Sequence, residues 1–183
     1  MAWRRLLLAS VALLASGLLA LGPGDAAPAL DGVTYVKGQA PDFAAQWTLV
    51  EFWATWCAPC KRTIPHLTEL LKQHGAKLAV VGLSDEDEAT VRPFVQAQGE
   101  AMGYSVGLVP KDTRERYMQG RSGIPCAFLV SPQKQVAWVG HPAAVMRCCS
   151  RPSRAASMWS GPSAFSPWRT PSRGPCRVVT STW

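Results

Sequence analysis

The order of apolar and polar positions divides the middle of the chain into strands and helices. Apolar runs of strand length occupy residues 48–53 and 77–83, as is typical of strands buried on both faces. Between them, apolar residues recur every three or four positions, which predicts an amphipathic helix. These apolar positions are Ile64, Leu67, Leu70 and Leu71. A strand, a helix and a second strand in this order predict a right-handed β-α-β unit.

The following residues predict further strands and helices of a mixed sheet. Residues 85–88 are all acidic, and we expect them to charge the first turn of a helix that ends near Gln98. A metal site formed by these carboxylates is the alternative interpretation. A short strand over 104–109 and a short helix over 111–118 come next. Two apolar runs around the turn at residues 131–134 then predict an antiparallel hairpin. We therefore expect an α/β fold with a central mixed sheet flanked by helices.

The start of the chain is typical of an export signal. Two arginines precede the uncharged apolar residues 6–21, and small residues and prolines follow as far as residue 29. Cleavage after Ala29 or after Ala26 fits the small-x-small pattern of signal cleavage. We therefore expect residues 1–29 to be removed and the protein to be periplasmic or otherwise exported. An uncleaved membrane anchor formed by residues 6–21 is the alternative.

The charge of the chain argues against nucleic-acid binding. The formal net charge is +7, but residues 25–142 carry 11 Lys and Arg against 12 Asp and Glu. The excess comes from the two arginines near the start and from six arginines in residues 143–183. Residues 25–142 contain no cluster of basic residues interleaved with aromatic ones, so we expect no nucleic-acid partner.

A hydrophobic content of 48% over 183 residues suffices for one domain with extensions.

A Cys-x-x-Cys pair lies where the first apolar strand meets the helix. Unpaired backbone N–H groups at a helix N-terminus lower the pKa of a thiol, so Cys57 is the candidate nucleophile. Cys60 lies one helical turn further along, within reach of a disulfide with Cys57. It can therefore resolve a mixed disulfide between Cys57 and a substrate. The pair can accept or donate two electrons.

Two further features fit dithiol chemistry. Glu51 interrupts an apolar strand six residues before Cys57, and burial would raise its pKa enough to accept the proton of Cys60 near neutral pH. A glutamate at a sheet edge facing water is the alternative. The Ile124-Pro125 bond precedes a predicted strand, where a cis bond would leave backbone groups free to pair with an extended substrate. A trans proline at a strand start is the alternative there.

Taken together, these motifs resemble the thioredoxin superfamily, and within it the exported TlpA-like thiol-disulfide reductases. The resemblance covers residues 32–142 and rests on four segments. They are the active-site signature at 50–60, the helix at 64–70, the proline-containing strand at 123–129 and the last hairpin at 136–142. The resemblance implies a thioredoxin-like domain over residues 30–142.

The resemblance also implies roles for single residues. Cys57 would attack, Cys60 would resolve, Glu51 would be the buried acid and Pro125 the cis-proline. We expect Trp56, Ile124 and Pro125 to contact the substrate. Substrates would be protein disulfides outside the cytoplasm, reduced without a bound cofactor or metal. An external thiol donor, soluble or membrane-bound, would then have to reduce the Cys-x-x-Cys pair again.

The chain departs from the family pattern at several positions. Thr63 stands where many TlpA-like reductases carry a glutamate, so Glu51 would be the one acid that serves the dithiol. Cys126 stands where a threonine is common, and it either packs as a small apolar residue or lies within reach of the dithiol. Residues 143–183 have no amphipathic period, so we expect the family's C-terminal helix to be missing or altered. This tail is either frameshifted from near Val145 or a basic disordered extension.

Three other functions remain open at this point. A Cys-x-x-Cys pair can bind a soft ion such as Cu(I), which would make the protein a copper-handling module. A thiol peroxidase, related in fold, would use one cysteine to attack peroxide. An inactive truncated product would follow if loss of the C-terminal helix leaves apolar sheet surface uncovered.

Overall fold

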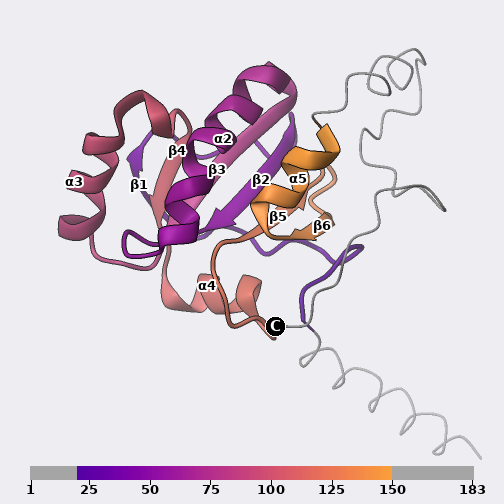
Figure 1. Cartoon of the computed structure of the whole chain (residues 1–183). Helices are drawn as coiled ribbons and strands as arrows, with labels where there is room; N and C mark the ends of the chain where they lie inside the picture. Colours follow the sequence, from indigo (N-terminus) through magenta and orange to yellow (C-terminus); the bar gives the residue numbers. More distant parts are fainter. Residues whose placement is uncertain (1–19, 150–183) are drawn as a thin grey trace, which may run out of the picture.

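The computed structural model describes residues 20–149 (Figure 1). The first 19 residues and residues 150–183 lie outside the described residues, and with them most of the predicted export signal and most of the predicted tail. Within residues 20–149, no helix is long and apolar enough to cross a bilayer.

Within residues 20–149, six strands form one mixed sheet. The sequence predicted the mixed sheet and five of these strands. Their bounds are β1 Thr34–Lys37, β2 Trp47–Phe52, β3 Leu78–Ser84, β4 Ser105–Leu108, β5 Cys126–Val130 and β6 Val136–Gly140. The order across the sheet is β1-β4-β3-β2-β5-β6. Strands β2, β3 and β4 run parallel, whereas β1, β5 and β6 are antiparallel to their neighbours. The central strand β2 therefore has a parallel partner on one side and an antiparallel partner on the other.

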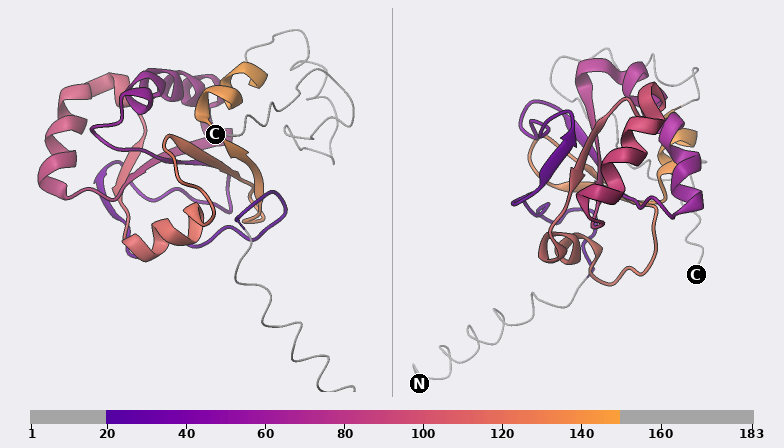
Figure 2. Two further views of the ribbon diagram at one scale, coloured as in Figure 1. Left: turned by 60° about the horizontal axis from the view of Figure 1, so that its bottom comes forward. Right: turned by 90° about the vertical axis from the view of Figure 1, so that its left-hand side faces the viewer.

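Helices cover both faces of this sheet (Figures 1 and 2). Their bounds are α2 Ala58–His74, α3 Glu88–Gln98, α4 Lys111–Met118 and α5 Pro142–Cys149, with short 3-10 helices at Gly75–Lys77 and Gly99–Met102. Helices α2, α3 and α5 bury side chains such as Leu67, Val95 and Val145 in one apolar cluster. Helix α4 buries Tyr117 in a second cluster that contains Phe128 of β5. The two clusters are the cores on opposite faces of the sheet.

Strand β2 contributes to both cores because successive side chains of a strand point to opposite faces. Val50 and Phe52 belong to the cluster beneath α4. Leu49 belongs to the cluster beneath α2, and Glu51, two residues further along, points to the same face. Glu51 is thus a carboxyl group on the apolar face that α2 covers.

Three parts of the fold differ from the sequence prediction. Strand β1 was not predicted, and it pairs with β4 as a four-residue edge strand. Helix α5 occupies residues that the prediction assigned to an altered tail from 143 onward, and it contacts α2. Residues 20–29 pack against the domain, although the predicted domain boundary lay after residue 29.

Candidate active site

The Cys-x-x-Cys pair forms a disulfide at the start of α2. Cys57 is the N-cap residue of the helix, and its Sγ accepts a hydrogen bond of 3.2 Å from the backbone N–H of Cys60. The S–S distance is 1.98 Å and the two Cα atoms are 5.2 Å apart. Pro59 occupies the first turn, where its missing N–H leaves no hydrogen bond unmade. The sequence therefore starts the helix at the sulfur and aims the free N–H groups of the first turn at it.

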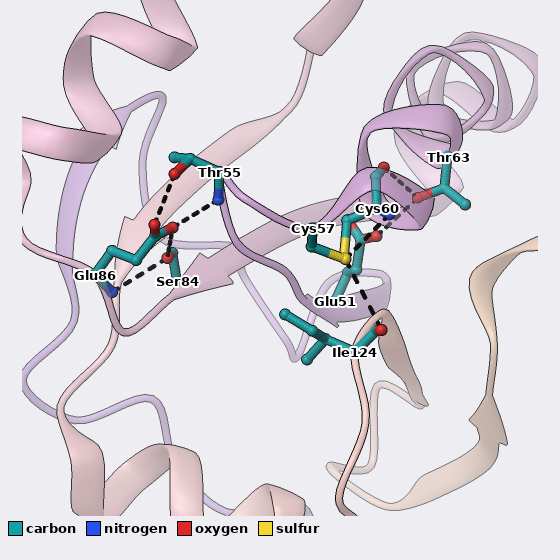
Figure 3. The surroundings of a disulfide bond; sticks show 8 residues. All are labelled: Glu51, Thr55, Cys57, Cys60, Thr63, Ser84, Glu86 and Ile124. Atoms are coloured by element: carbon teal, nitrogen blue, oxygen red, sulfur yellow. Dashed lines mark hydrogen bonds between the residues drawn. A yellow bond between two sulfur atoms is a disulfide. The ribbon is translucent and has the colours of Figure 1, made fainter. Parts of the chain in front are cut away.

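The disulfide is shielded from solvent. Cys57 is 2% exposed and Cys60 is fully buried, whereas the neighbouring Trp56 is 72% exposed. On the other side, the carbonyl oxygen of Ile124 lies 3.8 Å from Cys57 Sγ (Figure 3). The disulfide thus lies between the start of α2 and the loop that contains Ile124.

The loop before β5, the strand that pairs with β2, lies next to the disulfide. Its Ile124-Pro125 peptide bond is cis. Cys126, the next residue, pairs with Phe52 of β2 and lies in the apolar cluster beneath α4. Cys57 belongs to the cluster on the opposite face. Burial raises the pKa of the Cys126 thiol, with Arg121 acting weakly in the other direction. Of the two alternatives for Cys126, packing in the core is the one that the structure supports.

Glu51 lies beneath the first turns of α2 and has no solvent exposure. It is therefore not the sheet-edge glutamate that was the alternative. Loss of hydration raises the pKa of its carboxyl to about 8, and the smaller effects of Thr63 and Tyr104 lower it. Burial and the Glu51 charge in turn raise the pKa of Tyr104 well above its usual value. The Tyr104 hydroxyl and the Glu51 carboxyl thus each shift the pKa of the other. Within the described residues, however, neither the Tyr104 hydroxyl nor Glu51 Oε2 makes a hydrogen bond of normal geometry.

Thr63 connects the buried acid to the cysteine helix. Its Oγ1 lies 3.1 Å from Glu51 Oε1 and 2.8 Å from the carbonyl oxygen of Cys60 (Figure 3). A hydroxyl has one proton, so Thr63 donates to only one of these acceptors at a time. When Glu51 is ionised, the hydroxyl can donate to the carboxylate. When Glu51 is protonated, it can donate to Thr63, which is then free to donate to Cys60. The hydrogen bonding beneath the disulfide therefore depends on the charge of Glu51.

A second carboxyl group holds the loop that leads into Cys57. Glu86 accepts hydrogen bonds from the backbone N–H and the hydroxyl of Thr55, both 2.7 Å long, and from the Ser84 hydroxyl at 3.0 Å. These contacts tie the end of β3 to the loop two residues before Cys57 (Figure 3). The sequence did not identify Glu86, because an acidic run before a helix is usually interpreted as a charged helix start.

Asp87 and Glu88 lie at the start of α3 as predicted, whereas Asp85 pairs with Arg114 of α4. Asp87 is the N-cap residue of α3 and accepts a hydrogen bond of 2.8 Å from the backbone N–H of Thr90. Glu88 pairs with Arg92 one turn along the same helix. The metal site that was the alternative for residues 85–88 does not form, because in the described part of the chain no three His, Cys, Asp or Glu side chains are grouped to hold an ion.

The sequence of the chain matches one family model over most of the folded region. Residues 23–139 match the model described as the AhpC/TSA family. The chain belongs to the AhpC/TSA family. The thioredoxin of Bacillus subtilis (strain 168) is 35% identical over 91 residues, which are 42% of this chain and 88% of that protein. The thioredoxin of Staphylococcus saprophyticus is 38% identical over 74 residues, 35% of this chain and 71% of that protein.

Solved structures agree on the fold. The thioredoxin domain of a thiol-disulfide oxidoreductase from Bacteroides vulgatus superposes with a TM-score of 0.56 at 24% identity, covering 66% of this chain and 89% of that chain. A putative thiol:disulfide interchange protein DsbE from Chlorobium tepidum gives a TM-score of 0.55 at 22% identity, and the match covers 67% of this chain and 86% of that chain. The predicted thioredoxin-like fold is thus confirmed. Together with the family and the thioredoxin relatives, these matches confirm the predicted class, a thiol-disulfide oxidoreductase of the thioredoxin superfamily.

The buried carboxyl group makes stability depend on pH. Because folding raises the pKa of Glu51 to about 8, the folded state holds the proton that the unfolded state loses near pH 4.5. The free energy of unfolding therefore contains a contribution that is complete below pH 4.5 and falls as pH rises toward 8. Glu51→Gln removes this loss, so the variant should gain on the wild type by a few kcal/mol between pH 5 and pH 9. Each tenfold difference in proton affinity between the two states corresponds to about 1.4 kcal/mol.

Urea unfolding of the oxidised protein between pH 5 and pH 9 tests this prediction. Glu69→Gln is the matched control, because Glu69 is exposed on α2 and should show no such trend. A constant difference between Glu51→Gln and the wild type at every pH would contradict the burial of the Glu51 carboxyl.

Glu86 should contribute more to the stability of the folded protein than an exposed carboxylate does. Glu86→Gln keeps the size of the side chain but leaves one acceptor oxygen for the three donors of Thr55 and Ser84. We expect the free energy of unfolding to fall by about 1–3 kcal/mol. Glu88→Gln, which breaks only the exposed pair with Arg92, should cost less than about 1 kcal/mol. Urea unfolding at pH 7 measures both, and equal costs would contradict a special role for Glu86.

Proposed function

We propose that this protein reduces disulfide bonds of other proteins outside the cytoplasm. One observation carries the proposal: Cys57 and Cys60 form a disulfide at the N-terminus of α2, above a buried acid whose pKa is raised to about 8. A dithiol in this position has a stabilised outer thiolate, and the acid supplies a proton acceptor for the inner thiol. The thioredoxin relatives support the same class of chemistry.

The reaction transfers two electrons to the substrate. In the reduced protein, the Cys57 thiolate attacks one sulfur of the substrate disulfide, and the second substrate sulfur leaves as a thiolate. The Cys60 thiolate then attacks Cys57 Sγ, which restores the disulfide of the enzyme and releases the first substrate sulfur. An external thiol donor must reduce the enzyme again. The cycle uses no bound cofactor or metal.

Glu51 accepts the proton that Cys60 loses in the second step. A carboxyl with a pKa of about 8 can both take up and release a proton near neutral pH, whereas an ordinary carboxylate would be too weak a base. Thr63 contacts both the carboxyl and the backbone of Cys60, so it holds the acceptor at the start of α2. Its hydrogen bond also lowers the pKa of Glu51, against the larger effect of burial.

The substrate chain binds beside Trp56 and along the loop of Ile124 and Pro125. The exposed indole of Trp56 provides an apolar contact next to Cys57, and the carbonyl oxygen of Ile124 lies 3.8 Å from the sulfur. An extended substrate that hydrogen-bonds to this backbone places its own disulfide against Cys57. The apolar stretch near the start of the chain supports an exported location.

Replacing the cysteines one at a time separates the two steps. Cys57→Ser should lower insulin reduction by dithiothreitol to the rate measured without enzyme, because no outer thiolate remains. Cys60→Ser should accumulate a mixed disulfide with insulin, which non-reducing electrophoresis and mass spectrometry detect. Cys126→Ala, which changes the thiol in the opposite core, should keep the wild-type rate. Retained turnover in Cys57→Ser would refute the proposed function.

Thr63 should set the pH dependence of the second step. Its hydrogen bond lowers the pKa of Glu51, so Thr63→Val should move the midpoint of the resolution rate to higher pH. Thr63→Ser keeps the hydroxyl and should keep the midpoint. Thr68→Val removes another buried hydroxyl of α2, one that bonds to Ala101, and controls for general damage to the helix.

The measurement is the release of substrate thiol from a preformed mixed disulfide at Cys57 between pH 6 and pH 10. Equal shifts in Thr63→Val and Thr68→Val would contradict a specific contact between Thr63 and the proton acceptor.

A further inference from the structure

Residues 20–29, here called the N-terminal segment, are paired with the edge of the sheet. The backbone N–H of Gly24 donates to the carbonyl of Val136 at 2.8 Å, and the N–H of Val136 donates to the carbonyl of Asp25 at 2.9 Å. The N–H of Ala27 donates to the carbonyl of Lys134 at 2.8 Å. An antiparallel bridge between residues 26 and 135 lies in the middle of these bonds. The N-terminal segment therefore extends the pairing of the sheet beyond the start of β6.

The same segment closes the core beneath α4. Leu21 is 9% exposed and packs in the apolar cluster of that face. Its carbonyl accepts a hydrogen bond of 2.8 Å from Arg121 Nη2. The hydroxyl of Tyr117, a fully buried residue, donates to the carbonyl of Pro28 at 2.7 Å. Figure 2 shows the indigo N-terminal segment beside the hairpin of β5 and β6.

The residue that follows α4 also fits closely against the N-terminal segment. Gly120 follows α4 with a φ of +72°, and a Cβ atom on it would lie 2.8 Å from the Cβ of Ala20. Glycine is the residue that tolerates both this backbone conformation and this close approach. The AhpC/TSA family match, an independent observation, begins at residue 23, inside the segment.

Neither cleavage position predicted from the sequence is compatible with this packing. A cut after Ala26 removes Leu21 from the core and leaves both backbone groups of Val136 without their partners. A cut after Ala29 also removes the acceptor of the buried Tyr117 hydroxyl. Buried polar groups without partners and an emptied core position both destabilise a domain.

We propose that the export signal is cut upstream of the N-terminal segment, after Gly17, so that the mature protein begins at Leu18 and keeps the whole segment. Ala15 and Gly17 supply the small-x-small pattern before the cut. The apolar run from Leu6 to Leu14 has a length that falls within the range of about 7–15 residues of a signal core. The proposal rests on the proposed export of the protein and not on its redox chemistry.

The mass of the exported chain tests the proposal directly. The full chain with a C-terminal affinity tag is produced in an exporting bacterium, purified from the periplasmic fraction and measured by intact mass spectrometry. The expected mass is that of a chain starting at Leu18. A start at Ala27 or Leu30, or a chain that keeps Met1, would overturn the proposal. Insulin reduction by the same sample tests the redox function separately, so the two can fail independently.

Substitutions directly before the three candidate cleavage positions, after Gly17, Ala26 and Ala29, test which of them is used. Gly17→Leu places a large side chain directly before the proposed cut and should block processing there, so the start at Leu18 should be lost. Ala26→Leu and Ala29→Leu change exposed positions of the N-terminal segment, and both should leave the start at Leu18. A start at Leu18 in Gly17→Leu, or its loss in either of the other two variants, would contradict the proposal.

The stability of the exported chain tests whether the N-terminal segment is packed into the domain. Leu21→Ala should lower the midpoint of thermal unfolding by about 4 °C or more, because it empties a buried site. Pro23→Ala, at an exposed position of the same segment, should change it by less than about 2 °C. Equal midpoints for Leu21→Ala and the wild type would show that the N-terminal segment is not part of the folded domain.

Discussion

The hydrogen bond from the backbone N–H of Cys60 to Cys57 Sγ is the interaction on which the proposed chemistry of the site depends. It exists because β2 ends at Phe52, a short loop leads to Cys57 and α2 begins immediately after it, so a free helix N-terminus faces the sulfur. The sheet holds the strand in a fixed register, and Glu86 fastens the intervening loop through Thr55. A sulfur in this position is stabilised as a thiolate without any neighbouring cation. The fold thus places the N-terminus of α2 against Cys57 Sγ.

The second constraint is the carboxyl of Glu51 in an apolar core. A buried carboxyl is costly when ionised, and that cost raises its pKa to about 8. Gly82 lies opposite Glu51 in the sheet, and a Cβ there would lie 3.0 Å from the ring of Tyr104. The small residue leaves room for that ring near the acid. The buried carboxyl therefore lowers the stability of the folded state as pH rises, and in the proposed function it is the proton acceptor for Cys60.

The sequence predicted the parts of the fold that local pattern determines. The buried strands, the amphipathic helix and the Cys-x-x-Cys pair at its start follow from apolar spacing, and the burial of Glu51 follows from its place in an apolar strand. Strand β1 was missed because it is short and half exposed. The contacts of Thr63 and Glu86 were missed because each joins segments that only the folded chain brings together. The packing of residues 20–29 against the domain was not predicted, because small residues and prolines fit both a signal cleavage region and a close-packed edge.

The central claim, that the helix N-terminus stabilises the Cys57 thiolate, can be tested by the pH dependence of alkylation. In the reduced protein, the rate at which iodoacetamide modifies Cys57 is followed by mass spectrometry of its peptide between pH 4 and pH 10. We expect a midpoint well below the value of about 8.5 of a free cysteine. A midpoint at or above that value would contradict the claim.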